Sequence, residues 1–371
     1  MRLLFLIHSL NIGGIETYVL RFAKWLHSNY PDIEMHIICK SGLFGPYEEE
    51  YRKEGVFLHP IKLGYFNLIR YLRFYKFLRL LKIDAICDFS GDFSGLPALC
   101  SFAARIPKRL IFYRNSRDSF KQSFTKKIYI RFMNLLVRSF GTKILSNSWE
   151  ALRFYFPDYK NYKAPRFYVI PNGIPIPKLI SGEEKIALRA SIGVPDDQPI
   201  ILHVGNCRRQ KNHKLILSVA TKCKENKDNA SFVLIGSGVR AAYEKIVQEL
   251  GLYNVKLLDV RRDVYSIMQI SDVFIFPSFF EGQPNALLEA IISGLPFIAS
   301  DINSIRELLP ISWGKRWLFD PNNADEAYEL LKLHLSYDFR KDKDFLNLVE
   351  LFRARHDENN CFEKFFSLIN E

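Results

Sequence analysis

Two glutamates stand eight residues apart in the stretch FPSFFEGQPNALLEAIISGLPFIAS. Glu281 precedes a Gly-Gln-Pro turn, whereas Glu289 falls within an apolar segment whose spacing predicts a helix. Proline favours the first turn of a helix and glycine its end, so we expect this helix to run from about Pro284 to Gly294. Asn285 and Glu289 are four residues apart and therefore share its one polar face. A buried carboxylate needs a bonding partner, and vicinal hydroxyls such as those of a ribose would provide one for Glu289.

Three cations follow the end of another predicted strand, in the stretch HVGNCRRQKN. The strand ends at Gly205, and Arg208, Arg209 and Lys211 come directly after it and before a helical segment. Cations beside the start of a helix suit a diphosphate, because side-chain charge and backbone N–H groups then act on the same anion. The alternative interpretation of this stretch alone is a solvated basic loop. The strand in VLIGSG also ends in glycines, and because glycine has no side chain we expect the floor of the ligand cleft to be open at Gly236.

A third candidate is the pair of glycines Gly13 and Gly14, in the stretch NIGGIETYV after the first predicted strand. Glycine lets a backbone approach a phosphate closely, and the first N–H groups of the following helix attract anions. The pattern is not the GxGxxG of a dinucleotide-binding domain. A tight turn between a strand and a helix would explain the two glycines equally well.

The candidate residues follow strand-like segments that alternate with helix-like ones along most of the chain. Short apolar runs separated by helical segments predict parallel sheets covered by helices on both faces. Ligands of such sheets bind beyond the carboxyl ends of the strands. The predicted strands are RLLFLIH, IEMHIICK, DAICDFS, RLIFYR, TKILSNS and RFYVIPNG in the first half, and PIILHVGN, ASFVLIGSG, VKLLDV, DVFIFPS and PFIASD in the second.

The domain linker is predicted in VIPNGIPIPKLISGE, residues 169–183, which is rich in proline and glycine. We therefore expect an N-terminal domain over residues 1–175 and a C-terminal domain over residues 176–345. The remaining segment, residues 346–371, is expected to form a helix that packs back on the N-terminal domain.

The composition is that of a soluble globular protein large enough for two cores, with 371 residues, 48% of them hydrophobic and 25% charged. Its formal net charge of +12 favours polyanions, anionic membrane surfaces or small anionic substrates. The six cysteines lack the paired spacing of a zinc site, so we expect reduced thiols in a cytoplasmic protein. The N-terminal MRLLFLIHSLNIGG is interpreted as a strand entering a loop rather than as a signal peptide. No apolar run reaches the roughly 18 residues of a spanning helix.

The string Pro-Ser-x-x-Glu-Gly-x-Pro-x-x-x-x-Glu-Ala…Gly-x-Pro resembles the E-x7-E signature of the family 4 retaining glycosyltransferases, which have the GT-B fold. GGIE resembles the N-terminal glycine loop of that family, and VIPNGI resembles its interdomain segment. VGNCRRQKN resembles its Gly-Arg…Lys-Asn segment, and SDVFIFPS its last core strand. Together these motifs span most of residues 1–310 in the expected order. The resemblance implies an α/β chain with two Rossmann-like, doubly wound parallel-sheet domains facing across a cleft.

The resemblance also implies a function, that of a retaining hexosyltransferase of the bacterial surface-polysaccharide type. Glu281 would contact the transferred sugar, Glu289 would bind the ribose hydroxyls, and Lys211 would neutralise the diphosphate. The implied catalytic residues are Glu281, Lys211 and Arg209. Gly13 and Gly14 would lie against the diphosphate and the acceptor. The implied donor-binding residues are Glu289, Gly205, Asn206, Arg208, Gly282, Gln283, Pro284, Asn285 and Gly236.

The chain departs from the family pattern at two places. Asn206 stands where the family usually has an arginine, so phosphate contact is left to Arg208 or Arg209. Many members carry a histidine after the strand that corresponds to RLIFYR, where this chain has Arg114 and Asn115. These two residues are candidate contacts for a sugar or the acceptor, and a surface loop is the alternative.

The expected mechanism follows from charge. Breaking the anomeric C–O bond leaves negative charge on the diphosphate and positive charge on the sugar, and fixed cations with helix-start dipoles would stabilise the first. We therefore expect no metal and no cofactor, with a UDP- or GDP-linked sugar as the substrate. The string DKD at residues 342–344 looks like a metal-binding motif, but it lies in the C-terminal tail and is interpreted as surface charge.

Two basic segments predict contact with an anionic membrane. In LIRYLRFYKFLRLLK a cation recurs at every third residue, and this spacing winds around a helix without defining one face. In KKIYIRFMNLLVR, the residues Lys127, Arg131, Asn134 and Arg138 share one narrow face, so we assign Lys127, Arg131 and Arg138 to membrane contact. The alternative is an amphipathic core helix with a solvated basic side.

The acceptor implied by this picture is a glycan, carried on a polyprenyl diphosphate at the inner face of the cytoplasmic membrane. The products would be capsule, O-antigen, exopolysaccharide or lipopolysaccharide, made from a donated hexose or N-acetylhexosamine. We expect no nucleic-acid partner. The competing hypotheses are a non-catalytic GT-B relative and another nucleotide-dependent Rossmann enzyme, against which the missing GxGxxG and the intact glutamates argue.

Overall fold

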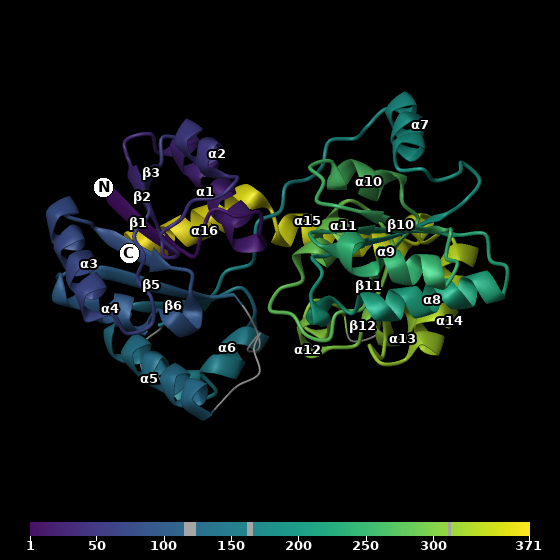
Figure 1. Cartoon of the computed structure of the whole chain (residues 1–371). Coiled ribbons are helices and arrows are strands. Elements are labelled where there is room, and N and C mark those ends of the chain that lie inside the picture. The colour runs from purple at the N-terminus through teal and green to yellow at the C-terminus, as the bar shows by residue number, and fades with distance from the viewer. Residues whose placement is uncertain (115–123, 162–165, 311–312) are drawn as a thin grey trace. The chain divides into compact units, whose positions relative to one another are not determined.

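The computed structural model describes residues 1–114, 124–161, 166–310 and 313–371 (Figure 1). The chain divides into two compact units. The first comprises Met1–Gly173 together with Glu358–Glu371, and the second comprises Ile174–Asp357. The six cysteines are all free thiols.

The first unit contains a sheet of seven parallel strands in the order β3-β2-β1-β4-β5-β6-β7. Its strands are β1 Arg2–Ile7, β2 Glu34–Cys39, β3 Phe57–His59, β4 Ala85–Asp88, β5 Lys108–Tyr113, β6 Lys143–Ser146 and β7 Phe167–Val169. Six of them were predicted from their apolar runs, and the short edge strand β3 was not. The order reverses between β1 and β4, and ligands bind near such a reversal, beyond the carboxyl ends of the strands.

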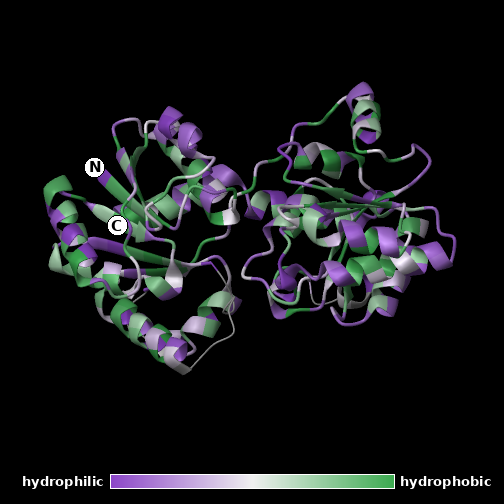
Figure 2. Ribbon diagram, viewed as in Figure 1, coloured by the Kyte–Doolittle hydropathy of each residue, from purple (hydrophilic) through white to green (hydrophobic). Residues whose placement is uncertain are grey.

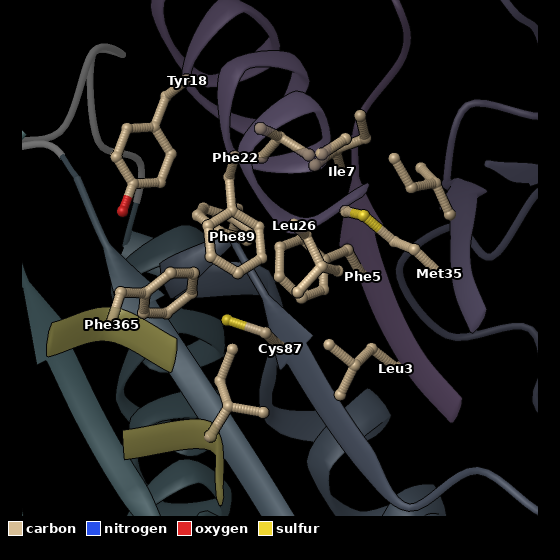
Figure 3. Close-up of a cluster of buried hydrophobic side chains, with 14 of the residues drawn as sticks. Leu3, Phe5, Ile7, Tyr18, Phe22, Leu26, Met35, Cys87, Phe89 and Phe365 are labelled. Carbon is tan, nitrogen blue, oxygen red and sulfur yellow. The ribbon is translucent and has the colours of Figure 1, made fainter. Parts of the chain in front are cut away.

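Helices cover both faces of this first sheet, because residues along a strand point alternately to either side. On one face Leu3 and Phe5 pack with α1 and α16, while on the other Leu4 and Leu6 pack with α3 and the residues around α4. Figure 3 shows Phe365 of α16 beside Phe22 of α1, with ring centroids 5.0 Å apart. The helices of this unit are α1 Gly14–Asn29, α2 Glu48–Lys53, α3 Leu68–Leu81, α4 Gly95–Ala103, α5 Phe124–Phe140, α6 Trp149–Tyr155 and α16 Glu358–Asn370.

The second unit contains a sheet of six parallel strands in the order β10-β9-β8-β11-β12-β13. Its strands are β8 Ile200–Val204, β9 Ser231–Ile235, β10 Val255–Leu258, β11 Val273–Phe276, β12 Phe297–Ser300 and β13 Leu318–Phe319. The order reverses between β8 and β11, which brings the loops that follow these two strands together. The two-residue strand β13 was not predicted.

The second sheet is also covered on both faces, with Leu202 and Ile201 of β8 in different hydrophobic clusters. Figure 2 shows its central strands mainly in green between helices that carry purple residues. Its helices are α7 Gly182–Ser191, α8 His213–Glu225, α9 Val239–Glu249, α10 Val264–Ile270, α11 Asn285–Ile292, α12 Asn303–Arg306, α13 Gly314–Trp317, α14 Ala324–Ser336 and α15 Lys343–Arg355. The predicted α/β fold with two doubly wound parallel sheets is confirmed.

The C-terminal segment agrees with the expectation only in part, because α16 belongs to the first unit and α15 does not. Residues 346–371 do not form one continuous helix. Helix α15 ends at Arg355 and α16 begins at Glu358, and of the two only α16 belongs to the first unit. Helix α15 stays with the second unit because its apolar side chains pack there. Phe345 stacks on Trp317, at 5.3 Å between centroids, and Phe352 is buried in the same cluster. The division near the linker falls between Gly173 and Ile174, two residues before the expected one. In the described part of the chain, no helix combines the length and hydropathy needed to cross a membrane.

Candidate functional site

The second unit brings Lys211 and Glu281 together at the carboxyl edge of its sheet. Lys211 Nζ donates a hydrogen bond to Glu281 Oε1 at 2.7 Å, and the same ammonium lies 5.0 Å from the centroid of the Phe276 ring. Glu281 is buried, with 7% of its surface exposed. The carboxylate that most needs a partner is therefore Glu281 rather than Glu289, which is only half-buried.

The two loops that carry this pair are held to each other by hydrogen bonds. Lys211 ends a short 3₁₀ turn after β8, and Glu281 follows β11. Phe279 N–H donates to the Gln210 carbonyl at 2.9 Å, and Gln210 Nε2 donates to the Phe280 carbonyl at 2.6 Å. These contacts fix the ammonium against the carboxylate through the backbone, so the pair is positioned by the fold and not by two flexible side chains alone.

The loops after β8 and β9 also approach each other closely. A Cβ atom added at Gly236 would lie 2.1 Å from the Gly205 carbonyl oxygen, so only glycine fits there. Cys207 N–H donates to the Ser237 carbonyl at 2.9 Å, and Asn206 Oδ1 accepts from Ser237 N–H at 3.2 Å. Asn206, the departure from the family pattern, therefore joins the two loops with its side chain.

Helix α11 begins at Asn285, one residue later than predicted, and Pro284 takes the position before it. Gly294 follows its end with φ of 74°, a conformation that glycine adopts without strain. Leu287, Leu288, Ala290 and Ile291 are buried, whereas Asn285 and Glu289 are half-buried. The predicted polar face is therefore present. Gly282, Gln283 and Pro284 are buried in the turn that leads into the helix.

Arg208 and Arg209 are exposed beside the 3₁₀ turn that ends at Lys211. Both cations come shortly before the start of α8, whose helix dipole adds positive charge at that end. Cations at such a position can stabilise a diphosphate, and the half-buried carboxylate of Glu289 can accept bonds from hydroxyl groups.

Two buried histidines near Gly205 were not singled out from the sequence. His203 Nδ1–H donates to the Ile275 carbonyl at 2.9 Å, and His213 Nε2–H donates to the Gly205 carbonyl at 3.2 Å. Burial lowers the pKa of His213 to about 4 and that of His203 well below its usual range, so both rings are neutral at physiological pH. Both rings lie beside Gly205 and help to hold the turn there in place. Neither His203 in a strand nor His213 at the start of a helix differs in sequence from a histidine that only packs in the core.

The first unit places its candidate residues at the carboxyl edge of its own sheet. Gly13 precedes α1 and Gly14 begins it, and a Cβ atom at Gly13 would lie 2.5 Å from Glu16 Oε2. Arg114 follows β5 and is buried, with Nη2 donating to Asn172 Oδ1 at 2.5 Å. Asn115 lies outside the described residues.

The proposed membrane residues of α5 do not share one environment. Lys127 and Arg131 are exposed, but Arg138 forms an ion pair with Asp158 at 2.7 Å, and Asn134 accepts a hydrogen bond from Tyr113 at 2.8 Å. The narrow polar face read from the sequence thus points partly into the protein, because β5 and the segment after α6 supply polar partners. Arg138 is engaged by Asp158 and is not part of an open basic surface.

Comparison with known families accounts for both units. The model described as "Glycosyltransferase Family 4" matches residues 12–177, and the model described as "Glycosyl transferases group 1" matches residues 184–345. The two matches meet at the linker and together include the glycine loop, the cations after β8 and both glutamates.

Individual relatives cover most of the chain. The Staphylococcus aureus capsular polysaccharide biosynthesis glycosyltransferase CapH is 28% identical over 315 residues, covering 81% of each chain. The Escherichia coli UDP-Gal:alpha-D-GlcNAc-diphosphoundecaprenol alpha-1,3-galactosyltransferase is 27% identical over 307 residues, covering 79% of this chain and 77% of that protein. Anabaena Alr3699/HepE, solved in complex with UDP and glucose, superposes with a TM-score of 0.82 at 18% identity, over 100% of this chain and 99% of that one.

Proposed function

Because this chain belongs to the glycosyltransferases, with a family 4 domain followed by a group 1 domain on the GT-B fold, we propose that it transfers a hexose or an N-acetylhexosamine from a nucleoside-diphosphate sugar to a glycan. The observation that carries this proposal is the Lys211–Glu281 pair, with its 2.7 Å contact a few residues before α11. The pair thereby holds a cation for the departing diphosphate beside a carboxylate for the sugar.

The chemistry proposed for this site needs only groups of the chain itself. As the anomeric C–O bond breaks, Lys211 and the exposed Arg208 or Arg209 stabilise the diphosphate, and the starts of α8 and α11 add their dipoles. Glu281 stabilises the positive charge on the sugar or orients one of its hydroxyls. Glu289 binds the ribose. The reaction retains the anomeric configuration and needs no metal.

The acceptor is proposed to be a lipid-linked glycan of a surface polysaccharide. Two relatives support this class: CapH takes part in capsular polysaccharide biosynthesis, and the E. coli enzyme acts on a sugar carried on diphosphoundecaprenol. The net charge of +12 suits both an anionic acceptor and an anionic membrane. The proposed products are capsule, O-antigen, exopolysaccharide or lipopolysaccharide.

Thermal unfolding with nucleotides tests the donor site. In buffer with EDTA, UDP or GDP at about 100 times its Kd should stabilise the folded chain by about 2.7 kcal/mol, because only the folded state binds it. Glu289→Ala should abolish that shift by removing the ribose contact. The control is Glu329→Ala, which changes a 67% exposed glutamate on α14.

A shift with NAD alone, or a UDP or GDP shift that survives Glu289→Ala, would contradict the proposal. Transfer of radiolabelled sugar to extracted lipid-linked glycan then separates an enzyme from a non-catalytic relative. An NMR spectrum of the product, which reports the anomeric configuration, tests retention.

A membrane-contacting surface is proposed on the first unit. Exposed apolar residues at the start of α3 lie beside α5, because the Phe66 ring contacts the Tyr129 ring at 5.0 Å between centroids. Leu68 is 74% exposed and Ile128 is 55% exposed, while Lys127 and Arg131 stand next to them on α5. Figure 2 shows green and purple residues mixed along both helices. Apolar side chains surrounded by cations suit the surface of an anionic bilayer.

Removal of two cations should weaken binding to vesicles that contain phosphatidylglycerol. Each well-placed cation contributes about 1 kcal/mol, so Lys127→Gln with Arg131→Gln should reduce vesicle partitioning roughly 30-fold. Lys245→Gln with Lys341→Gln is the matched control, since both lysines are exposed on the second unit. Equal losses in the two double variants, measured by co-sedimentation, would show that the effect is one of net charge only.

A further inference from the structure

Three aromatic rings of the first unit gather on its surface rather than in its core. The Tyr65 ring contacts the Phe93 ring at 5.5 Å and the Tyr129 ring at 5.7 Å between centroids, and the centroids of Phe93 and Tyr129 are 6.0 Å apart. Tyr65 is 63% exposed, Phe93 is 38% exposed, and Tyr129 is half-buried. These three residues are named the aromatic platform. Exposed aromatic residues that touch one another, unlike single ones, are typical of an interaction site.

The aromatic platform lies at the carboxyl edge of the first sheet. Phe93 ends the 3₁₀ turn Gly91–Phe93, which comes shortly after β4, and Tyr65 lies in the loop between β3 and α3. Tyr129 is in the second turn of α5. The strand order reverses between β1 and β4, and ligands of such sheets bind beyond the carboxyl ends of the strands near a reversal. The three rings are therefore on the ligand-binding edge of this unit.

A buried lysine holds two of the loops that carry the platform. Lys40 follows β2, and its Nζ donates to the Phe93 carbonyl and to Asp88 Oδ2, both at 3.3 Å. The Lys40 carbonyl accepts a hydrogen bond from Leu63 N–H at 3.2 Å, two residues before Tyr65. The side chains of Lys40 and Asp88 are 10% and 1% exposed. Buried contacts thus fix the loops under the rings, as is usual for a site that is formed before its ligand arrives.

Polar groups accompany the rings. Burial raises the pKa of Tyr129 to about 12, and the Tyr65 hydroxyl and the Asp92 carboxylate act on it in the same direction. Both groups therefore lie within electrostatic range of the Tyr129 hydroxyl. Asp92 is half-buried, and its Oδ2 accepts a hydrogen bond from the Tyr155 hydroxyl at 3.4 Å. The surface thus combines apolar rings with hydroxyl groups and a carboxylate.

This combination fits a sugar ring better than a lipid. A pyranose has C–H groups on its faces, which pack on aromatic rings, and hydroxyl groups at its rim, which donate to a carboxylate. An isoprenoid chain would place apolar groups against the Asp92 carboxylate, and an anionic headgroup would be repelled by it. The charge beside the rings therefore favours a neutral ligand that carries hydroxyl groups.

We propose that the aromatic platform, with Asp92 beside it, binds a neutral sugar ring of the acceptor glycan. This inference rests on the proposed function and makes its acceptor more specific. The membrane-contacting surface around Leu68 and Ile128 adjoins the platform, because the Phe66 ring contacts the Tyr129 ring at 5.0 Å. A lipid-linked glycan would then meet the platform next to the surface that receives its anchor.

Saturation-transfer difference NMR measures this binding without turnover. The probes are the methyl glycosides of glucose, galactose and N-acetylglucosamine at millimolar concentration, and at least one of them should receive saturation at its C–H protons. Tyr65→Leu keeps an apolar side chain but removes the ring, so it should lower that signal about threefold or more, whereas Tyr65→Phe should retain it. Tyr253→Leu, which changes an 87% exposed tyrosine of the second unit, is the matched control.

The contrary results are distinct from one another. Absence of a signal from all three glycosides, or equal signals from the native chain and Tyr65→Leu, would overturn the proposal. An unchanged glycoside signal together with weaker partitioning of Tyr65→Leu into phosphatidylglycerol vesicles would assign the platform to the membrane instead. Because Tyr65 is exposed, Tyr65→Leu should unfold at the same temperature as the native chain, which guards against a signal lost through misfolding.

Transfer kinetics provide a second readout. Tyr65→Leu should raise the KM for the lipid-linked glycan by about 3- to 10-fold and leave the KM for the nucleotide sugar unchanged, because only a contact with the acceptor is lost. An unchanged KM for the glycan would contradict the acceptor role.

Failure of this inference can be told apart from failure of the proposed function. A UDP or GDP shift that is present in Tyr65→Leu but absent in Glu289→Ala would show that the donor site stands independently of the platform. Conversely, a glycoside signal that depends on Tyr65, in a chain that no nucleotide stabilises, would support the platform as a sugar-binding site and contradict the donor site.

Discussion

Replacing Lys211 with methionine is expected to reduce kcat by about 100- to 1,000-fold, the loss seen when one preorganised charge-stabilising group is removed. Methionine keeps most of the apolar stem and removes only the ammonium that lies 2.7 Å from Glu281 and 5.0 Å from the Phe276 centroid. The KM for the nucleotide sugar should change less, because charge on the diphosphate grows as the bond breaks. Initial-rate kinetics with saturating acceptor measure both constants. Lys214→Met, an exposed lysine on α8, is the matched control.

The same substitution has a structural cost that must be separated from the catalytic one. Without Lys211, the buried Glu281 loses its cation, and we expect a loss of about 1–3 kcal/mol in the free energy of unfolding. Adding Glu281→Gln removes the carboxylate and should recover most of that stability. It should not recover kcat, because neither charge is then present. A double variant that is both stable and active would show that the pair serves the fold and not the reaction.

The fold was largely predictable because most strands are short apolar runs buried on both faces. The exceptions are informative. Strand β3, Phe57–His59, has an exposed first residue, and β13 has only two residues, so neither shows a distinct apolar run. The packing of α15 in the second unit involves the stacking of Phe345 on Trp317, a contact between residues that sequence periodicity does not relate.

The candidate site was predictable in its residue types but not in its pairings. Spacing placed Asn285 and Glu289 on one face of a helix, since that geometry is local. The contact between Lys211 and Glu281 joins residues 70 positions apart and arises because β8 and β11 are neighbours in the sheet. Likewise, Asn206 looked like a lost phosphate ligand, whereas its bond to the Ser237 N–H comes from the adjacency of β8 and β9. Sequence spacing likewise assigned Arg138 to a membrane-contacting face, because it does not show that Arg138 pairs with Asp158, 20 positions further along the chain.

Gly236→Ala is the substitution from which we expect the largest effect of a single added methyl group. The added Cβ would lie 2.1 Å from the Gly205 carbonyl oxygen and 3.0 Å from the Asn206 backbone nitrogen, and both are backbone atoms that cannot rotate away. The loops after β8 and β9 must then separate. That separation strains the bonds from Cys207 N–H to Ser237 and from Ser237 N–H to Asn206. Overpacking of this kind costs about 1–3 kcal/mol.

The loss of stability should be accompanied by a loss of donor binding, because the displaced loop is the one that carries Lys211. Urea unfolding measures the first, and titration calorimetry with the nucleoside diphosphate measures the second, with an expected loss of tenfold or more in affinity, which corresponds to about 1.4 kcal/mol. Gly182→Ala is the control, since a Cβ atom at Gly182 meets no atom within 4 Å. A Gly236→Ala chain with unchanged stability and affinity would show that the two loops can move apart freely. The position of Lys211 would then have to be set by its contacts with the Glu281 loop alone.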